Sequence, residues 1–269
     1  MINRANYAKL LWPGVNSFYG EAYAEFPVEY TGLFDTFTSQ KAFEEDVGLT
    51  GFGLAAIKSE GGATTYDDSQ QGFINRFQHV AYSLGFIITE EMIEDDQYRI
   101  PSQKKAASLA YSMRQTKEVV GANVYNRAFS STYTGGDTKE LCATDHPNVS
   151  GGSWANELAT AADISEAALE QAIIDMGKWT DDRGLKIAVM PQKLIIPVDM
   201  QFDVERILMS PLQAGNSNND INALKSTGRF PGGVFVNHYL TDADAWFIRT
   251  NVPEGMKYFE RRADAFSDD

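Results

Sequence analysis

The chain has 269 residues, of which 43% are hydrophobic and 12% aromatic, a composition that supports a packed core and excludes a disordered protein. Its 37 acidic and 23 basic residues give a formal net charge of −14. The densest basic clusters are only pairs, Lys104 with Lys105 and Arg261 with Arg262, which excludes a protein that grips nucleic acid through a basic stripe.

The first 47 residues are rich in aromatic side chains but show no helical or strand period, and prolines and glycines interrupt them. This pattern predicts an extended arm. Large apolar side chains in such a segment need a surface to bury them, either the body of the same chain or a neighbouring subunit. The sequence leaves both possibilities open. The residues before Pro13 carry no secretion signal, and no run of about 18 apolar residues predicts a membrane span.

A long hairpin is predicted next. Two apolar runs, residues 47–57 and 73–88, flank a polar stretch that carries Gly61 and Gly62, the pattern of two strands joined by a turn. A hairpin of this length with a hydroxyl-rich tip does not fold back easily onto its own domain. We therefore expect it to project.

A long helix is expected from Pro101 to about residue 129, because proline and serine start it and helix formers follow. Its spacing places one set of side chains on an apolar face, namely Ala106, Leu109, Met113, Val120 and Val124. A second set is expected on other faces, namely Lys104, Lys105, Arg114, Lys117 and Glu118.

The remaining chain predicts a lobe of helices and short strands. A loop over 130–160 precedes a helix capped by Ser165 and ended by Gly184, and a second helix covers 200–208. Short apolar runs predict strands over 185–190, 194–198, 233–240, 245–249 and 256–261. Residues 213–222 form a polar, asparagine-rich loop.

The sequence offers no catalytic, metal or cofactor site. Its three histidines and single cysteine show no metal-ligand spacing, and its glycines match no nucleotide-binding motif. Cys142 and His146 form the one conceivable catalytic pair, and the simpler interpretation is a small buried Cys142 beside a turn. Acidic clusters such as residues 94–96 are expected to be solvated. We predict a protein that is not an enzyme and needs no cofactor.

The ordered segments resemble those of tailed-bacteriophage major capsid proteins with the Hong Kong 97-type fold, most of all the Mu-like major head subunits. The resemblance covers nearly the whole chain. It rests on the aromatic arm, the hairpin, the long helix, the Thr144–Pro147 turn, the prolines Pro191 and Pro197, and the loop before Trp246.

The resemblance implies an α+β fold divided along the chain. Residues 1–47 would be the N-terminal arm and 48–95 the extended loop, a β-hairpin that lies over a neighbouring subunit. Residues 96–160 would form a peripheral domain with the long helix as its spine, and 161–251 an axial domain with a mixed sheet flanked by helices. Residues 252–269 would return to the peripheral domain. Because similar proteins continue beyond this point, we expect a further C-terminal piece.

The resemblance also implies interface residues. In the arm these are Tyr19, Phe26, Tyr30 and Phe34, and in the extended loop they are Lys58, Gly61, Gly62, Tyr66 and Arg76. The loop at the capsomer centre would present Asn216, Asn218, Asn219 and Asn222.

The implied function is self-assembly, as pentamers and hexamers, into an icosahedral shell around double-stranded DNA that is held without sequence-specific contacts. Partners would include scaffolding, portal or decoration proteins but no membrane, and the protein would assemble in the bacterial cytoplasm and reside in the virion. Two alternatives remain open, an encapsulin-like compartment subunit and a soluble enzyme that uses Cys142 and His146.

Overall fold

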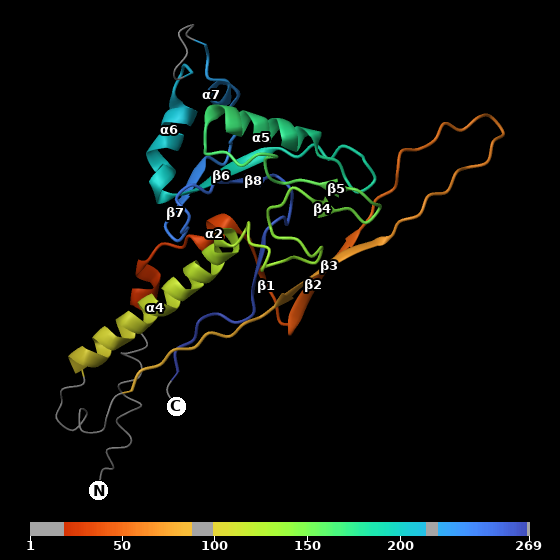
Figure 1. Ribbon diagram of the computed structural model, residues 1–269. Helices are drawn as coiled ribbons and strands as arrows, with labels where there is room; N and C mark the ends of the chain where they lie inside the picture. The colour runs from red at the N-terminus through yellow and green to blue at the C-terminus, as the bar shows by residue number, and fades with distance from the viewer. Residues whose placement is uncertain (1–18, 88–98, 214–219, 268–269) are drawn as a thin grey trace. The chain divides into compact units, whose positions relative to one another are not determined.

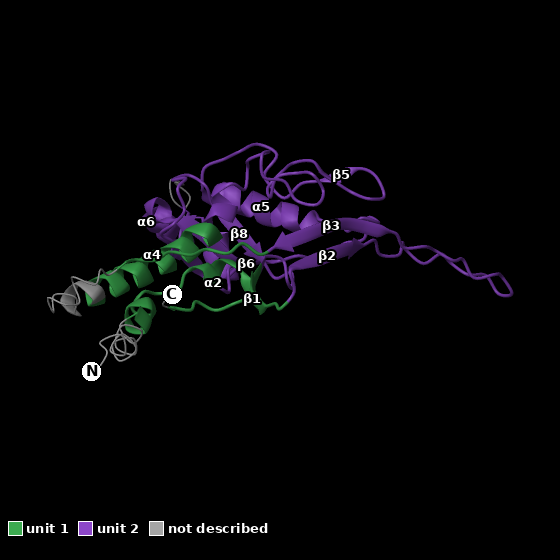
Figure 2. Ribbon diagram, turned by 90° about the horizontal axis from the view of Figure 1, so that it is seen from below, with its two compact units in different colours: residues 1–40, 79–121, 258–269 green, residues 41–78, 122–257 purple. Residues whose placement is uncertain are grey.

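The computed structural model describes residues 19–87, 99–213 and 220–267 (Figure 1). The chain divides into two compact units, each assembled from segments that lie far apart in the sequence (Figure 2). Unit 1 comprises residues 1–40, 79–121 and 258–269, and unit 2 comprises residues 41–78 and 122–257. The predicted arm up to residue 18 and the asparagines Asn216, Asn218 and Asn219 lie outside the described residues.

Unit 1 gathers chain segments around the long helix. The predicted helix is confirmed as α4, Arg99–Asn126, of 28 residues, of which those up to Gly121 belong to this unit. A helix over 19–25 and α2, Tyr30–Leu33, precede the strand β1, Asp35–Thr38. Strand β1 pairs with β9, Lys257–Glu260, in a two-stranded sheet. The segment expected to be an arm is therefore, from residue 19 on, partly regular structure.

The distribution of side chains on α4 differs from the predicted one. Arg114 and Glu118, expected away from the apolar face, are buried, whereas Val124, expected on that face, is exposed. Glu118 is buried because its carboxylate accepts the backbone N–H groups of Glu29 and Tyr30. These partners come from a distant segment, so the periodicity of the helix does not reveal them.

In unit 2, the predicted hairpin is present as an antiparallel pair with shorter strands than expected. Strand β2 is Phe43–Leu49 and β3 is Gln71–Gln78, with Phe43 opposite Gln78 and an irregularity between Val47 and Leu49. Residues 50–70 between them hold no strand. The prediction that the strands continue over residues 50–57 and 79–87 was wrong, because these residues have no neighbouring strand in the described part of the chain. Residue 88, the predicted end of the second strand, lies outside the described residues.

A mixed three-stranded sheet forms the core of unit 2. The central strand β6, Pro191–Pro197, pairs in parallel with β7, Val234–Asn237, and antiparallel with β8, Phe247–Thr250. Its prolines stand at its two ends, where they cost the fewest ladder hydrogen bonds. The central core cluster that the sheet shares with the helices comprises Leu169, Leu194, Ile196, Met200, Val204 and Leu224.

Three helices surround this sheet: α5, Glu166–Lys178; α6, Gln201–Met209, which follows a 3-10 turn over Val198–Met200; and α7, Ala223–Thr227. Ser165 caps α5 as predicted, with its hydroxyl accepting the N–H of Ala168 at 3.1 Å. Strands β4, His146–Pro147, and β5, Ser153–Trp154, form a small separate pair.

Two local predictions in this region were wrong, and one short helix was not predicted. Helix α5 ends at Lys178 rather than Gly184, and residues 185–190 contain only an isolated bridge at Lys186 instead of a strand. The carboxylate of Asp181 accepts the N–H groups of Arg183 and Leu185 and holds a turn there. The short helix α7 was not predicted, because five residues give too little periodicity.

Candidate interaction surfaces

The most exposed apolar side chains of unit 2 lie on the tip, which we define as residues 50–70. In Figure 1 the tip extends well beyond the rest of this unit. Leu54 and Tyr66 are 87% and 91% exposed, and Phe52 and Ile57 are also exposed. Exposed apolar groups gathered on one segment mark an interaction surface. The tip is therefore the first candidate for contact with another molecule.

Local contacts shape the end of the tip. The N–H of Gly62 donates to the carbonyl of Ser59 at 3.0 Å, and Gly61 has a φ of 75°, a left-handed conformation suited to glycine. The Lys58 ammonium lies 3.4 Å from the Thr64 hydroxyl. The structure thus brings Lys58, Gly61 and Gly62 together in one turn. Whether they touch a neighbouring subunit stays a prediction.

Asp67 links the two sides of the tip close to the strands; we call this part, around Gly53 and Asp67, the neck of the tip. The Asp67 carboxylate accepts the N–H of Gly53 at 2.7 Å and pairs with the Arg183 guanidinium at 2.5 Å. The bond from Gly53, then those from Arg183 and from the N–H of Asp68, lower the pKa of Asp67 to about 2. This latch ties the tip to the loop after α5 within unit 2, and no local sequence signal indicates it.

Protonation of Asp67 is expected to loosen the neck. Because its pKa is lower in the folded chain than its ordinary 3.8, the latch is fully present above pH 4 and is lost as the pH falls through about 2. Asp67→Asn imitates the protonated form at neutral pH, so the amide of Gly53 should exchange with deuterium faster there. Nuclear magnetic resonance of the Asp67 carboxyl checks the same point, and titration near pH 4 in the native chain would contradict the latch.

The base of the hairpin is fixed to unit 2 by two contacts. The side-chain oxygen of Asn75 accepts the N–H of Gly136 at 2.7 Å, and Asp46 pairs with Lys257 at 2.6 Å. A side chain at position 136 would place its Cβ 2.2 Å from the backbone oxygen of Ile74, so only glycine permits this approach. The body of the hairpin is thereby held firmly while its tip projects.

Arg76, predicted as an interface residue, has partners within the hairpin. Its guanidinium pairs with Glu45 at 2.5 Å and lies 4.5 Å from the centre of the Phe43 ring. These contacts cross from β3 to β2 and stabilise the pair of strands. Arg76 therefore has a structural role in the hairpin, and a contact with another subunit stays a prediction.

The predicted arm aromatics pack within unit 1. Tyr19 stacks on Phe266 with ring centres 5.0 Å apart, Phe26 lies 4.7 Å from Tyr111, and Tyr30 and Phe34 both contact the ring of Tyr258. Tyr19, Tyr30 and Phe34 are buried and Phe26 is half-buried. The sequence left open whether these side chains are buried against the same chain or against a neighbouring subunit. In the structure they pack against other residues of the same chain. A contact of this segment with a neighbour stays a prediction.

The buried carboxylate of Glu118 connects α2 to α4, and Arg114 of the same helix forms an ion pair with it. Glu118 accepts the N–H of Tyr30 at 2.7 Å and that of Glu29 at 3.2 Å, and its other contact is Arg114 at 3.1 Å. The side chains of Arg114 and Glu118 are 5% and 1% exposed. Since each charge compensates the other in a dry environment, removal of either one leaves an unpaired buried charge.

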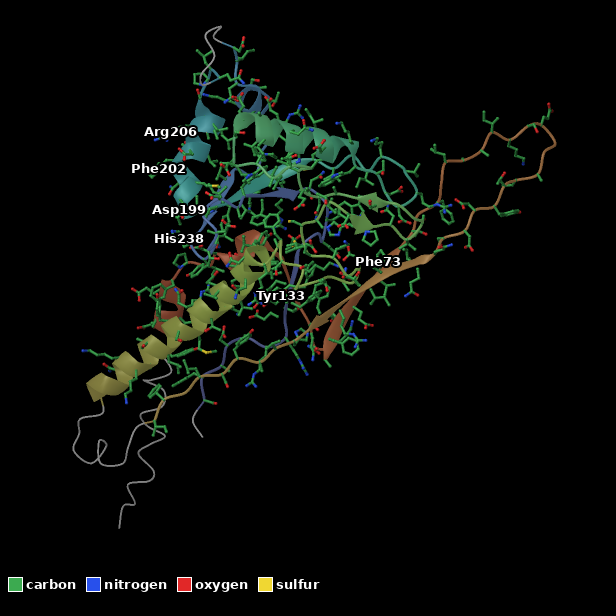
Figure 3. The ribbon with its side chains drawn as sticks, viewed as in Figure 1. Phe73, Tyr133, Asp199, Phe202, Arg206 and His238 are labelled. Atoms are coloured by element: carbon green, nitrogen blue, oxygen red, sulfur yellow. The ribbon has the colours of Figure 1, made fainter. Side chains whose placement is uncertain are left out.

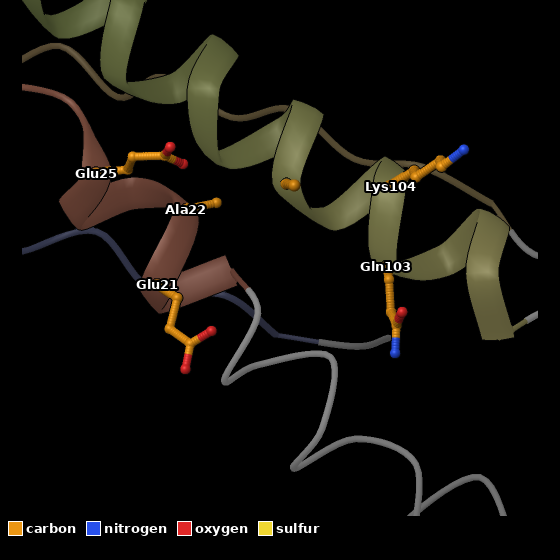
Figure 4. Close-up of a pocket in the computed structure, with 6 residues that line it drawn as sticks. Glu21, Ala22, Glu25, Gln103 and Lys104 are labelled. Carbon is orange, nitrogen blue, oxygen red and sulfur yellow. The ribbon is translucent and has the colours of Figure 1, made fainter.

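A shallow groove of about 510 Å³ also lies in unit 1, between the helix over 19–25 and α4 (Figure 4). It is lined by Glu21, Ala22, Glu25, Gln103, Lys104 and Ala107. The lining contains neither a nucleophile paired with a base nor a set of metal-ligating groups. The groove therefore indicates no chemistry.

The outer side of α6 is a further exposed surface of unit 2. Figure 3 shows Phe202 and Arg206 on the side of α6 turned away from the sheet, and Phe202 and Met209 are strongly exposed. The predicted loop residue Asn222 is not part of such a surface. It is buried, its oxygen caps α7 by accepting the N–H of Lys225 at 3.2 Å, and its amide donates to the carbonyl of Ile207. The prediction that Asn222 is presented by an exposed loop was wrong, because capping buries it.

Cys142 and His146 do not form a catalytic pair. Nδ1 of His146 lies 2.6 Å from Asp137 and Nε2 lies 3.2 Å from Asn156, while the ring stacks on Trp154. Both ring nitrogens are thus engaged by groups other than the thiol. Burial, with a smaller contribution from Glu157, raises the pKa of Cys142 to about 12. The thiol is protonated at neutral pH and is a poor nucleophile.

We expect Cys142 to be almost inert in the folded chain. Fewer than about one thiol in 10⁴ is ionised at pH 7 when the pKa lies this high, and only the thiolate reacts. A disulfide reagent should label the native protein slowly and the urea-unfolded protein at the rate of an ordinary thiol. Rapid labelling of the native chain at pH 7 would contradict this assignment.

Asn156 organises this loop region and was not identified from the sequence. Its oxygen accepts the N–H of Ala143 at 2.8 Å, and its amide donates to the carbonyl of Leu141 at 2.7 Å. Within the described ranges, no three His, Cys, Asp or Glu side chains gather as candidate metal ligands. In the same part of the chain, no helix has both the length and the apolar character needed to cross a membrane.

Comparison with known proteins adds a family and a fold. The model of the phage capsid protein family matches residues 75–268, and no curated protein matches the chain. The bacteriophage JBD30 capsid shares a TM-score of 0.59 at 14% identity, covering 81% of this chain and 92% of that one. The JBD30 procapsid gives 0.56 at 14% identity, covering 91% and 100%. The JBD30 capsid decorated with minor capsid protein trimers gives 0.52 at 12% identity, covering 80% and 92%.

Proposed function

The chain belongs to the phage capsid protein family, and we propose that it is the major capsid protein of a tailed phage or prophage, with the Hong Kong 97-type fold. It forms the shell of the phage head. In this proposal copies of the chain assemble as pentamers and hexamers into an icosahedral shell that encloses double-stranded DNA. Family and fold both point to a structural protein rather than an enzyme.

The observation that carries the proposal is the tip. Phe52, Leu54, Ile57 and Tyr66 are exposed on a segment that extends away from its own unit, while the hairpin beneath is held by polar contacts (Figure 1). A chain that functions alone gains nothing from displaying these side chains to water. Repeated copies supply the missing partner through head-to-tail contacts that close into rings.

The proposed domain layout follows the resemblance. Residues 1–47 are the arm, 48–95 the extended loop, 96–160 the peripheral domain, 161–251 the axial domain and 252–269 the return to the peripheral domain. The described part of the last segment supports its return to the long helix, because Glu260 pairs with Lys117 of α4 at 2.6 Å within unit 1.

The proposed partners are other copies of the chain first, then scaffolding, portal and decoration proteins. Decoration by minor capsid protein trimers is named for the JBD30 capsid, whose fold is similar. The net charge of −14 suits a wall that contains DNA without adhering to it, because like charges repel. In this proposal the protein assembles in the bacterial cytoplasm and then resides in the virion.

Size-exclusion chromatography with light scattering, followed by electron microscopy, tests the proposal. We expect the purified full chain to yield pentamers, hexamers or closed shells. Shells that enclose protein cargo instead of DNA would favour a nanocompartment subunit. A strict monomer or dimer at high concentration, also with a scaffolding protein present, would contradict the proposal.

A further inference from the structure

The β2–β3 hairpin carries uncharged, exposed segments at both of its ends. At one end, residues 47–57 contain no Asp, Glu, Lys or Arg. At the other end, residues 77–89 also contain none, and Val80 and Leu84 are 68% and 57% exposed. Apolar segments in water at both ends of one hairpin call for a common explanation.

The segment over 79–87 has the properties of a strand without a neighbour. Its larger side chains, Val80, Tyr82 and Leu84, stand at every second position and alternate with small residues, the period of a strand. No backbone hydrogen bond joins residues 79–86 to another described residue. Unpaired extended backbone with apolar side chains is a template for pairing with another strand.

The tip contains a segment with the same properties as residues 79–87. Residues 54–57 also make no backbone hydrogen bond to another described residue, and Leu54 and Ile57 are fully or nearly fully exposed. Two extended apolar segments with free backbone groups can pair with each other and cover each other's side chains.

The two segments leave opposite ends of strand β3 along the chain. Strand β3 has 8 residues and therefore spans about 26 Å, and the tip leaves one end of it while residue 79 leaves the other. Phe86 packs against the cluster of Tyr19, Leu109 and Ala110, and the carbonyl of Ile87 accepts from Lys105 at 3.3 Å. The far end of the 79–87 segment is thereby anchored in unit 1.

A second copy brings an uncharged segment of its own to the contact. Each copy carries a net charge of −14, so two acidic surfaces of neighbouring copies repel one another. A contact between two uncharged segments avoids this repulsion and gains the burial of apolar side chains. Complementary surfaces at opposite ends of one element join copies head to tail, in an arrangement that closes into a ring.

We propose that residues 54–57 of one copy pair, as an added strand, with residues from the 79–85 segment of the next copy. This inference rests on the proposed function and names the surface that receives the tip. The pairing is heterologous, so each copy gives its tip to one neighbour and receives a tip from another.

Disulfide cross-linking of the full chain tests the pairing. The variant Leu54→Cys with Leu84→Cys, in a Cys142→Ala background, should give under oxidation a ladder of covalent species that extends beyond dimers. A contact between identical surfaces would stop at dimers, and pairing within one chain would give only monomers of altered mobility. Either result would overturn the proposal.

Two controls complete the experiment. The control variant Leu54→Cys with Ile174→Cys places the second cysteine at an exposed apolar position of α5. Under the same oxidation it should form no covalent species larger than one chain. A charge pair avoids reliance on disulfide geometry: Leu54→Lys and Leu84→Glu should each lower particle yield at least tenfold, and the double variant should recover most of it. Absence of particles from the unaltered chain would contradict the proposed function. Normal particles without a ladder and without charge rescue would contradict only the pairing.

Discussion

Replacement of residues 51–69 by an Asn-Gly turn is expected to leave a folded subunit that forms no closed shells. The N–H of Thr50 donates to the carbonyl of Gln70 at 2.9 Å, so a two-residue turn at this point preserves β2 and β3. The variant loses Phe52, Leu54, Ile57 and Tyr66, whose full burial is worth about 1.5–3 kcal/mol each. A shell subunit thus loses roughly 6–12 kcal/mol of gross contact energy, an upper value.

Circular dichroism tests whether the shortened subunit is folded, and electron microscopy tests whether it forms closed shells. The spectrum should stay close to that of the unaltered chain, and closed particles should fall below detection. A control variant keeps the length of the unaltered chain and replaces only residues 52–57 by glycine and serine. It distinguishes loss of the apolar side chains from loss of the length of the tip, and it should also fail to assemble. Ser69→Ala, at an exposed polar position of the same tip, should assemble normally. Particles from the shortened chain would overturn the assignment of the tip.

Removal of the buried carboxylate of Glu118 is expected to produce the largest loss of stability in unit 1. Glu118→Ala leaves Arg114 as an unpaired buried charge and deprives the N–H groups of Glu29 and Tyr30 of their acceptor. Breaking a buried pair in this way costs about 3–5 kcal/mol. Thermal denaturation followed by circular dichroism should show a melting temperature lower by roughly 10 °C.

Lys104→Ala provides the matched control, because Lys104 lies on the same helix but is exposed, and its melting temperature should change by less than about 2 °C. Arg114→Met combined with Glu118→Leu removes both charges and should recover part of the loss. Recovery should stay incomplete because the two backbone amides still lack an acceptor. Equal stability of Glu118→Ala and the unaltered chain would show that the Glu118 carboxylate does not hold α2 on α4.

Elements with a strong local signal were predictable. The helix α4 begins two residues before the predicted Pro101, and Ser165 caps α5 as its position suggested. The strand β6, Pro191–Pro197, covers most of the predicted strand over 194–198 and begins three residues earlier, at a proline. In each case the signal lies within a few residues of the element, in capping groups, helix formers or prolines.

Predictions failed where contacts with residues distant in the sequence determine the secondary structure or the burial of a side chain. Residues 50–57 are apolar enough for a strand, but Asp67 takes the N–H of Gly53 and no strand lies beside them in the described chain. Glu118 accepts the N–H of Tyr30, 88 positions away, and Arg114 lies over the rings of Tyr23 and Tyr30. The latch of Asp67 with Arg183 spans 116 positions. Periodicity within one element contains no information on such pairs.

The sequence by itself determined that this is an acidic α+β chain with a long helix, a projecting hairpin and no catalytic motif, because composition, capping and hydrophobic spacing are local properties. The tertiary structure decided which apolar groups become core and which stay exposed. Tyr19, Tyr30 and Phe34 are buried in unit 1, whereas Leu54 and Leu84 remain in water. The physical reason is that burial depends on a partner surface, and only the folded chain shows which side chains have found one.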